Sequence, residues 1–427
     1  GDWALSHIKT KSGALWSTFI LAIVLGVDDY FNNLTTGNVM RPVTDGHHIS
    51  RAKLSYMCDA TAAPVCIMMP VSSWAAAVTG VIGNEEVGFQ IFLRAIPFNY
   101  YAILTLVFII VMTCLNIDYG PMRTHELNAA KGDLYTTPER PFAGVEEMKF
   151  NPNGKVIDLV LPVLVLVGGC VGSMVYVGYQ NGGTDLITAF ANTSAFDALP
   201  LGSLIALIIN MIYFMVRRSM KFTELMDCLP EGFKQMVPAI LILCLAWTIG
   251  DVTKALGAPE FVAGIVKNLS GSLYALLPAV VFIIAAFLGF ATGTSWGTFS
   301  ILLPIVIPVF SGGTPAVDLT VGDLNNNLLM ISIAATLGGA VMGDHCSPIS
   351  DTTIMASSGA QCYHLNHVAT QLPYAVTVAV VAFVNYIITA FIQVPFICLP
   401  IAIVSMVVVM LVIGKVNHSM NRHSQRD

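Results

Sequence analysis

Charged side chains are scarce in this sequence. Asp, Glu, Lys and Arg together make up 11% of the 427 residues, whereas soluble domains carry roughly 25%. Hydrophobic residues reach 55% and the mean hydropathy is +0.73, which argues against a water-soluble globular domain. The net charge of −6 is spread over a long chain, so the sequence also argues against a nucleic-acid partner.

Cysteine pairs at metal-binding or redox spacing are also lacking. The nine cysteines form no C-x-x-C pair, and most lie in apolar segments, where a free thiol behaves as a small hydrophobe. We therefore expect neither a disulfide framework nor a resident metal or other cofactor. No signal peptide is recognisable. The chain begins at Gly1 rather than Met, and we expect sequence upstream of it.

Long apolar runs are what the sequence does contain, and they recur from residue 13 to residue 414. A membrane span needs about 20 mostly apolar residues, so we predict an all-α, polytopic membrane protein of about ten spans. Some runs are interrupted: the run at 60–82 contains Pro64 and Pro70, and the run at 272–311 breaks at 292–297. Such interruptions predict broken helices or re-entrant hairpins facing a central site.

One long polar stretch, residues 117–155, divides the chain. We predict that it is an extramembrane loop. Residues 1–116 before it are predicted to form an N-terminal membrane repeat that is truncated at its start. Residues 156–427 after it are predicted to form a C-terminal membrane region that contains the second repeat.

A weak internal similarity supports the idea of two inverted repeats. The segment from Asp59 to Pro64 resembles the segment from Asp344 to Pro348, since each has an acid followed by a proline four or five residues later. Downstream of each lies an apolar-Pro-aromatic triplet, at 96–98 and at 372–374, which predicts a helix start in both places.

Acidic residues lie within or beside the apolar runs. A charged group at membrane depth costs several kcal/mol and by default marks an ion or substrate path. The acids concerned are Asp28, Asp29, Asp59, Asp344 and Asp351. Because neighbouring residues of a helix point in different directions, only one of Asp28 and Asp29 is expected to face the interior. Five acids within or beside apolar runs predict a transporter with an ion or substrate path through the membrane.

The segment 343–353 holds two of these acids in a densely polar stretch. Ser347 before Pro348 predicts a helix N-cap with proline at the first helical position. Asp351 then lies in the first turn, where the helix dipole favours its ionised form; it is either a persistent cation ligand or a helix cap. Asp344 follows an apolar run near a helix C-terminus, where its charge is disfavoured, so we expect Asp344 to exchange a proton for a cation.

Hydroxyl groups surround these two acids, and hard cations such as Na⁺ prefer oxygen ligands. The candidate hydroxyl ligands are Ser347, Ser350, Thr352 and Thr353. His345 is either a proton-relay member or a hydrogen-bonded orienter of Asp344, and we favour the orienter. Asp59 is a second candidate ion-binding acid, with Thr61 as a neighbouring ligand; the alternative is an interfacial acid at the end of a span.

Two other motifs have alternative interpretations. Gly293 to Gly297 matches the G-x-S-x-G elbow of serine hydrolases, with Ser295 as nucleophile, but that elbow needs a strand and both flanks here are apolar without strand alternation. We favour a helix break at Thr294 and Ser295 that lines the substrate cavity. His364 and His367 have a metal-pair spacing, yet only Cys362 lies nearby as a further ligand, so we expect satisfied histidines at a helix start.

These motifs together resemble the NhaC-type sodium/proton antiporter family. The segments that carry the resemblance are 27–32, 40–45, 59–66, 70–74, 293–297 and, most specific, 343–353. The resemblance implies a multi-pass secondary transporter of the bacterial inner (plasma) membrane rather than an enzyme. It also implies inverted repeats with helical hairpins, and transport by an elevator-like movement.

The function that follows is Na⁺/H⁺ antiport by alternating access at a midplane site, with Asp344 and Asp351 as Na⁺ ligands. Some relatives carry Lys where this chain has His345, and the family includes exchangers of small organic acids and carriers of amino acids. A Na⁺- or H⁺-coupled carrier of such solutes is therefore the alternative. The expected partners are the lipid bilayer, Na⁺ and H⁺, or a small organic anion or amino acid; a homodimer is left open.

Overall fold

The computed structural model describes residues 8–84, 87–139, 154–186, 189, 192–257 and 271–424, and every regular element in these ranges is a helix. The predicted all-α fold is confirmed. The α-helices are α2 Lys11–Val24, α3 Asp29–Gly46, α4 Arg51–Cys66, α5 Ser73–Ile82, α6 Gly88–Ala95, α7 Tyr100–Leu115, α8 Gly120–Ala129, α9 Ile157–Gln180, α11 Ala195–Val216, α12 Phe222–Ala255, α14 Gly271–Thr292, α15 Ser295–Phe310, α16 Asn327–Cys346, α17 Asp351–Gly359, α18 His364–Ile392 and α19 Pro395–Ser424.

Six helices in the described part of the chain are long and apolar enough to cross a membrane. They are α9, α11, α14, α16, α18 and α19. A seventh span results if α6 and α7, which meet at an angle of 46°, form one bent span. Three shorter apolar helices, α2, α5 and α15, accompany them. The protein is thus a multi-pass membrane protein, while the number of ten spans stays a prediction.

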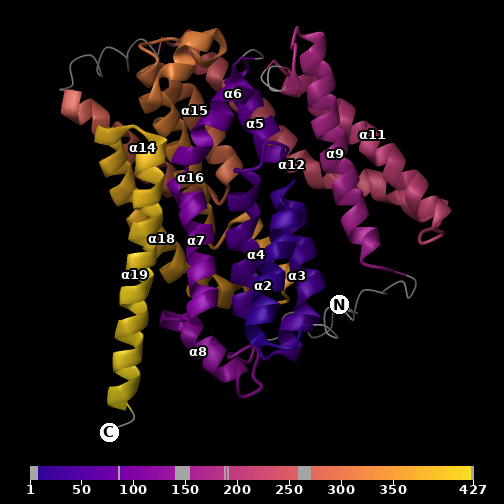
Figure 1. Cartoon of the computed structure of the whole chain (residues 1–427), viewed down its shortest axis with the longest axis vertical. Helices are drawn as coiled ribbons and strands as arrows, with labels where there is room; N and C mark the ends of the chain where they lie inside the picture. Colours follow the sequence, from indigo (N-terminus) through magenta and orange to yellow (C-terminus); the bar gives the residue numbers. More distant parts are fainter. Residues whose placement is uncertain are drawn as a thin grey trace.

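Helix α16 lies at the centre of the molecule, and 94% of its apolar segment is buried inside the protein. Helices α7, α14, α15 and α18 contact it on different sides, and α19 lies at one edge of the bundle beside α18 (Figure 1). Helices α9 and α11 pack on each other at the opposite side (Figure 1), and most of their apolar surface is exposed. Exposed apolar faces of this extent suit contact with lipid rather than with water.

Helices α14 and α16 approach each other so closely that only glycine fits between them. A Cβ atom placed on Gly343 would lie 2.2 Å from the backbone oxygen of Ala286, and one on Gly339 would lie 2.4 Å from that of Phe282. Small residues at helix contacts let backbones come together, and van der Waals packing then holds the pair. The seam joins the last turns of α16, which carry Asp344, firmly to α14.

The predicted helix interruptions are present in the structure. The run at 60–82 is divided into α4 and α5, which are separated by residues 67–72. The run at 272–311 is divided into α14 and α15, which are separated by Gly293 and Thr294. Gly293 has a φ of +68°, a left-handed conformation that glycine adopts without strain. Both breaks therefore arise from local backbone chemistry that the sequence makes visible.

The predicted matching helix starts are wrong in one of the two copies. Pro97 lies in the short 3-10 helix Ile96–Phe98, directly before α7, as expected. Pro373, in contrast, lies inside α18, which begins nine residues earlier at His364. The acids differ as well, since Asp59 is in the middle of α4 and Asp344 is in the last turn of α16. A helix of 29 residues tolerates this proline because its packing partners, α16 and α7 among them, support it.

The polar stretch 117–155 is described over 117–139 and 154–155; residues 140–153 lie outside the described part. Its first portion forms α8, which is tied to the membrane helices by charged contacts. The buried Lys53 of α4 pairs with Asp118, and Lys11 of α2 pairs with Glu126 at 2.5 Å. This portion lies at one end of the bundle, beside the lower ends of α2 and α4 (Figure 1).

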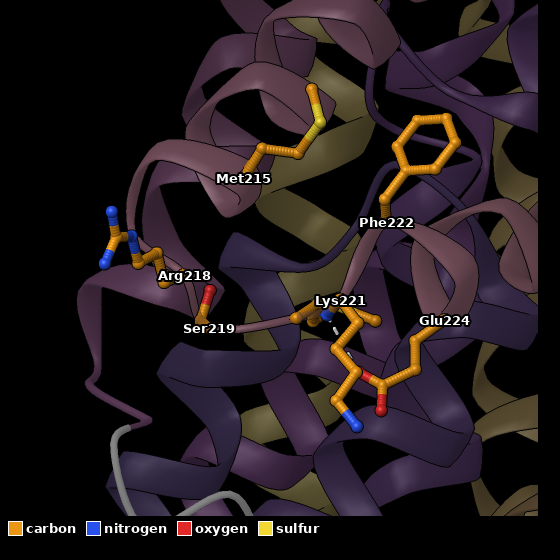
Figure 2. A pocket seen from close by; sticks show the side chains of 7 residues that line it. Met215, Arg218, Ser219, Lys221, Phe222 and Glu224 are labelled. Atoms are coloured by element: carbon orange, nitrogen blue, oxygen red, sulfur yellow. Dashed lines mark hydrogen bonds between the residues drawn. The ribbon is translucent and has the colours of Figure 1, made fainter.

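A pocket of about 540 Å³ opens at the connection between α11 and α12. Figure 2 shows its lining, which combines the apolar Met215 and Phe222 with the charged Arg218, Lys221 and Glu224. The Glu224 carboxylate accepts a hydrogen bond of 2.9 Å from the backbone N–H of Lys221 and so closes the start of α12. None of the acids predicted to bind ions lines this pocket.

Candidate ion-binding site

Two buried carboxylates meet at the first turn of α17. Asp59 lies on α4 and Asp344 on α16, and both are 0% exposed. The hydroxyl of Thr352 donates to Asp344 Oδ2 at 3.0 Å, and the hydroxyl of Thr353 donates to Asp59 Oδ2 at 2.9 Å. Consecutive residues of one short helix thus hold acids that are far apart in the sequence.

The local sequence explains why α17 starts where it does. The α16 helix ends at Cys346, directly before Ser347 and Pro348, and proline cannot continue a helix because it lacks the N–H donor. The chain then turns, and Ser350 in an extended conformation caps α17 by accepting a bond of 3.1 Å from the N–H of Thr353. The cap places both threonines at the start of the helix, next to the end of α16.

Helix α18 contributes two more side chains to Asp59. His367 Nε2 lies 3.2 Å from Asp59 Oδ2, and Gln371 Nε2 donates to the same oxygen at 2.6 Å. Residues four apart share one helix face, and both side chains are 0% exposed. The Gln371 amide also donates to the backbone oxygen of His345 at 2.8 Å. Asp59 Oδ2 is therefore contacted by residues of both α17 and α18.

The other oxygens of this cluster are not satisfied in the same way. Within the described residues, Asp59 Oδ1, Asp344 Oδ1 and Gln371 Oε1 have no hydrogen-bond partner. A buried polar atom without a partner costs about 1–3 kcal/mol, and more when it carries charge. Unpaired acceptors at one place inside a membrane protein need a ligand, a proton or a water to offset this cost.

A second pair of acids, Asp29 and Asp351, is joined by one tyrosine. The Tyr30 hydroxyl donates to Asp351 Oδ2 at 2.6 Å, while the Tyr30 backbone N–H donates to Asp29 Oδ1 at 3.2 Å. Asp351 also receives the backbone N–H of Thr352 at 2.8 Å. Asp29 is buried and Asp351 is partly buried.

Two tryptophans complete the surroundings of Asp29. The indole N–H groups of Trp74 and Trp296 donate to Asp29 Oδ2 at 2.9 and 3.3 Å. The two indole rings meet edge to face, with centroids 6.0 Å apart. They come from α5 and α15, the two short helices that follow the helix breaks. Asp29 therefore joins α3 to both half-helices.

The break between α14 and α15 lies against the connection between α16 and α17. The backbone N–H of Asp351 donates to the oxygen of Gly293 at 3.3 Å. A Cβ atom on Gly293 would lie 2.7 Å from the backbone oxygen of Ile349, so a larger residue would push the two connections apart. The polar starts of α15 and α17 consequently face the same region of the interior.

Comparison with known proteins identifies the family. The model of the Na⁺/H⁺ antiporter family matches residues 65–391, which is more than half of the chain. The chain belongs to the Na⁺/H⁺ antiporter family. Asp344 and Asp351 lie inside the matched range, and Asp29 and Asp59 lie before it. The resemblance to NhaC-type antiporters that the motifs indicated is confirmed.

Relatives of this antiporter-family protein agree with that assignment. An uncharacterized protein of Haemophilus influenzae is 36% identical over 404 residues, covering 91% of this chain and 73% of its own length. The malate-2H⁺/Na⁺-lactate antiporter of Bacillus subtilis is 26% identical over 41% of this chain and 35% of its own length. An uncharacterized Na⁺/H⁺ antiporter of H. influenzae is 30% identical over 39% of this chain and 34% of its own length. The chain is therefore a secondary transporter.

Four predicted site residues are confirmed in position. Asp29 is the inward-facing member of its pair, whereas the side chain of Asp28 caps α3 by accepting from the N–H of Phe31. Asp344 ends a helix and Asp351 starts one, as expected. Asp59 is fully buried and lies in the middle of α4.

The predicted role of Ser347 as helix N-cap is wrong. Ser350 caps α17, and Pro348 lies in the turn before it rather than at the first helical position. The Ser347 hydroxyl instead accepts from the N–H of Ile349 at 3.4 Å. The chain still turns at Pro348 and Ile349, and α17 begins only at Asp351. From this start Thr352 and Thr353 reach Asp344 and Asp59.

Two further predictions of side-chain contacts are not supported. His345 Nδ1 lies 3.0 Å from the Tyr101 hydroxyl of α7, and His345 Nε2 has no hydrogen-bond partner among the described residues, so neither ring nitrogen bonds to Asp344. The hydroxyl of Thr61 donates to the backbone oxygen of Met57, one turn earlier in its own helix, at 2.6 Å. Threonine commonly makes this bond inside helices, and it directs Thr61 away from Asp59.

The hydrolase interpretation of Ser295 loses its structural basis. The G-x-S-x-G segment joins two helices, α14 and α15, and not a strand to a helix. Thr294 caps α15 by accepting from the N–H of Gly297 at 3.4 Å, and the buried Ser295 hydroxyl has no partner among the described residues. The segment is a helix break, as the sequence favoured.

His367 and Gln371 are functional candidates that the sequence analysis missed. The prediction of a helix start at His364 is confirmed, and the His364 ring is satisfied by Ser357 and by the backbone oxygen of Pro348. His367, in contrast, contacts Asp59. The signal was available in part, because His367 and Gln371 are four apart and so share one face of a largely apolar helix, but their partner is about 300 residues away.

No group of three or more His, Cys, Asp or Glu side chains among the described residues could hold a metal ion. Hydrogen bonds place Asp344 with Asp59, through Thr352 and Thr353, and place Asp351 with Asp29, through Tyr30. The Na⁺ ligand pair of Asp344 and Asp351 stays a prediction. The oxygens available in the first cluster are those of carboxylates, hydroxyls and one amide, which suit a hard monovalent cation.

Proposed function

We propose that the protein is a Na⁺/H⁺ antiporter that binds the two ions alternately at Asp59 and Asp344. The observation that carries this proposal is the set of unpartnered carboxylate oxygens, one on each acid, in a fully buried cluster. A cation or a proton can occupy such a place, and the two compete for it. Competition at one carboxylate is sufficient to couple their fluxes in opposite directions.

The two acid pairs have different roles in this proposal. Asp344, in the last turn of α16, exchanges the proton for the cation, and Asp59 shares the cation with it. Asp351 receives hydrogen bonds at both carboxylate oxygens, which supports a role in anchoring the start of α17. Ser350 is the N-cap of α17, so of the roles considered for Asp351 we propose a structural one, in which it anchors the first turn of α17 through Tyr30 and the N–H of Thr352.

We further propose that transport follows an alternating-access cycle in the inner membrane, with the site near the midplane. The division into membrane regions 1–116 and 156–427 on either side of a loop at 117–155 is part of this proposal. It is supported by the composition of the site, because Asp59 comes from the first region and Asp344 from the second. An elevator-like movement is supported by the close seam between α14 and α16, which would carry Asp344 as one unit.

Proteoliposomes loaded with a pH-sensitive dye test the proposal. An inward Na⁺ gradient should drive H⁺ out of vesicles that contain the wild-type protein, without any organic solute present. Choline chloride at the same concentration controls for ionic strength, and empty liposomes control for leak. The absence of Na⁺-driven H⁺ flux, together with correct insertion of the protein, would contradict the proposal.

A second candidate is Na⁺- or H⁺-coupled transport of a small organic anion. The meeting of the starts of α15 and α17 favours it, because helix N-termini attract carboxylates. The carboxylate of Asp351 at the start of α17 opposes it, since it would repel an anion there. Uptake of labelled lactate or malate that depends on Na⁺, in the absence of Na⁺-driven H⁺ flux, would support this candidate over the first.

A further inference from the structure

Gln371 connects three parts of the candidate site. It lies on α18, and its side chain is 0% exposed. Its amide nitrogen donates to Asp59 Oδ2 at 2.6 Å and to the backbone oxygen of His345 at 2.8 Å. Through these bonds Gln371 links α4, which carries Asp59, to the turn of α16 that carries Asp344.

These two bonds fix the orientation of the amide. A carboxylate oxygen and a backbone carbonyl can only accept hydrogen bonds, so both need the NH₂ end of Gln371. A flipped amide would bring its oxygen against two acceptors and would lose both bonds. The oxygen Oε1 is therefore not the atom that bonds to these two partners, and it is left to accept from another group.

Gln371 Oε1 nevertheless has no hydrogen-bond donor among the described residues, and Asp59 Oδ1 has none either. The two side chains that carry these atoms are joined by the 2.6 Å hydrogen bond from Gln371 Nε2 to Asp59 Oδ2. A cation coordinated by oxygen would satisfy both acceptors at once, and amide oxygens of Asn and Gln are common ligands of hard cations.

We propose that Gln371 is a ligand of the transported cation, with Oε1 as a neutral oxygen beside the Asp59 carboxylate. The proposal rests on the antiport function proposed above and names a residue outside the set predicted from the sequence. A neutral oxygen coordinates the cation without adding negative charge to the site, so the carboxylate can still bind either a cation or a proton. The NH₂ end holds Asp59 in place while the oxygen end contacts the ion.

Two substitutions separate the ligand role from a purely positioning role. Gln371→Met keeps the length of the side chain but removes both the oxygen and the donors, and the KM for Na⁺ should rise about tenfold or more. Gln371→Glu keeps an oxygen in place of Oε1 and exchanges the NH₂ group for a second oxygen, which shares one proton with Asp59, so its KM for Na⁺ should stay within about threefold of wild type or fall. If Gln371 only positions Asp59 through its NH₂ group, both variants should weaken Na⁺ binding alike, and that result would overturn the proposal.

Thr370→Val is the matched control. Thr370 is buried one residue earlier on α18, and its hydroxyl bonds only to backbone oxygens of its own helix. This variant should leave the KM for Na⁺ unchanged. Should Gln371→Met fail to insert, Gln371→Asn keeps the amide but withdraws the oxygen by one carbon, and it should also raise the KM. A folded Met or Asn variant with the wild-type KM would refute the ligand role.

Na⁺ binding to the purified protein keeps this proposal distinguishable from antiport itself. The melting temperature of the wild-type protein in NaCl should exceed that in choline chloride, because a ligand that binds only the folded state stabilises it. The Gln371→Met variant should lose this difference. If the wild type shows neither the shift nor Na⁺-driven H⁺ flux, the antiport proposal fails; if it shows both and the Met variant does too, only the assignment of Gln371 fails.

Discussion

The two acid pairs of this protein, Asp59 with Asp344 and Asp29 with Asp351, differ in how their oxygens are satisfied. Asp59 and Asp344 each keep one oxygen without a partner among the described residues. Asp29 and Asp351 receive donors at both oxygens, from tryptophan, tyrosine and backbone N–H groups. A carboxylate with donors at both oxygens is already stabilised in place, whereas one with an unpartnered buried oxygen gains most from binding a ligand. The predictions below test this difference.

The largest effect is expected for Asp344→Asn. A neutral carboxamide can neither release a proton nor balance the charge of a cation, so Na⁺-driven H⁺ flux should be abolished while the protein still inserts. Dye-loaded proteoliposomes measure the flux, and size-exclusion chromatography of the extracted variant controls for folding. Exchange at the wild-type rate would refute the assignment of this acid to the transport step.

Tyr30→Phe tests the second pair. The substitution removes the hydroxyl that donates to Asp351 at 2.6 Å and leaves the ring in place. The loss of a hydrogen bond to a charged group costs about 1.5–3 kcal/mol, so the melting temperature should fall while the KM for Na⁺ stays at its wild-type value. A raised KM without loss of stability would show that the second pair also binds the ion, and the distinction between the pairs would then be wrong.

Trp74→Phe and Trp296→Phe compare two donors to one acceptor. Each substitution removes an indole N–H from Asp29 Oδ2 and retains an aromatic ring. The Trp74 bond is shorter, at 2.9 against 3.3 Å, so Trp74→Phe should destabilise the protein more, by about 1 kcal/mol or more. Thermal unfolding in the absence of Na⁺ measures both variants under the same conditions. Equal effects would mean that the second donor compensates for the loss of the first.

The smallest effect is expected for Thr61→Val, with Thr353→Val as its counterpart. Thr61 bonds to its own helix, whereas Thr353 donates to Asp59 Oδ2 at 2.9 Å. Removal of the Thr61 hydroxyl should leave the KM for Na⁺ unchanged, and removal of the Thr353 hydroxyl should change it about threefold to tenfold. Initial rates of H⁺ flux over a range of Na⁺ concentrations give the KM of each variant. A larger change in KM for Thr61→Val than for Thr353→Val would mean that Thr61 is a ligand after all.

The sequence predicted those features that depend on neighbouring residues. Low charge and long apolar runs predicted the all-α membrane fold, and Gly293 predicted a helix break because glycine tolerates the conformation that the break requires. Helix geometry predicted that only one of Asp28 and Asp29 would face inward, and the structure shows that it is Asp29. These are local signals, and the structure agrees with them.

The arrangement of the site could not be predicted in the same way. The bonds that Asp59 makes to Thr353, His367 and Gln371 span 294 to 312 residues. No local pattern specifies which distant helix face will meet an acid, and the proline directly after Ser347 made that serine a plausible cap. The choice between Ser347 and Ser350 depends on where α17 starts.

The bond between Gly293 and Asp351 has a mechanical consequence. It joins the break between α14 and α15 to the connection between α16 and α17. Neither connection can therefore be displaced alone without breaking a backbone hydrogen bond inside the protein. In the alternating-access cycle proposed above, we therefore expect α15 and α17 to shift together, and a solute bound at one connection to affect the other.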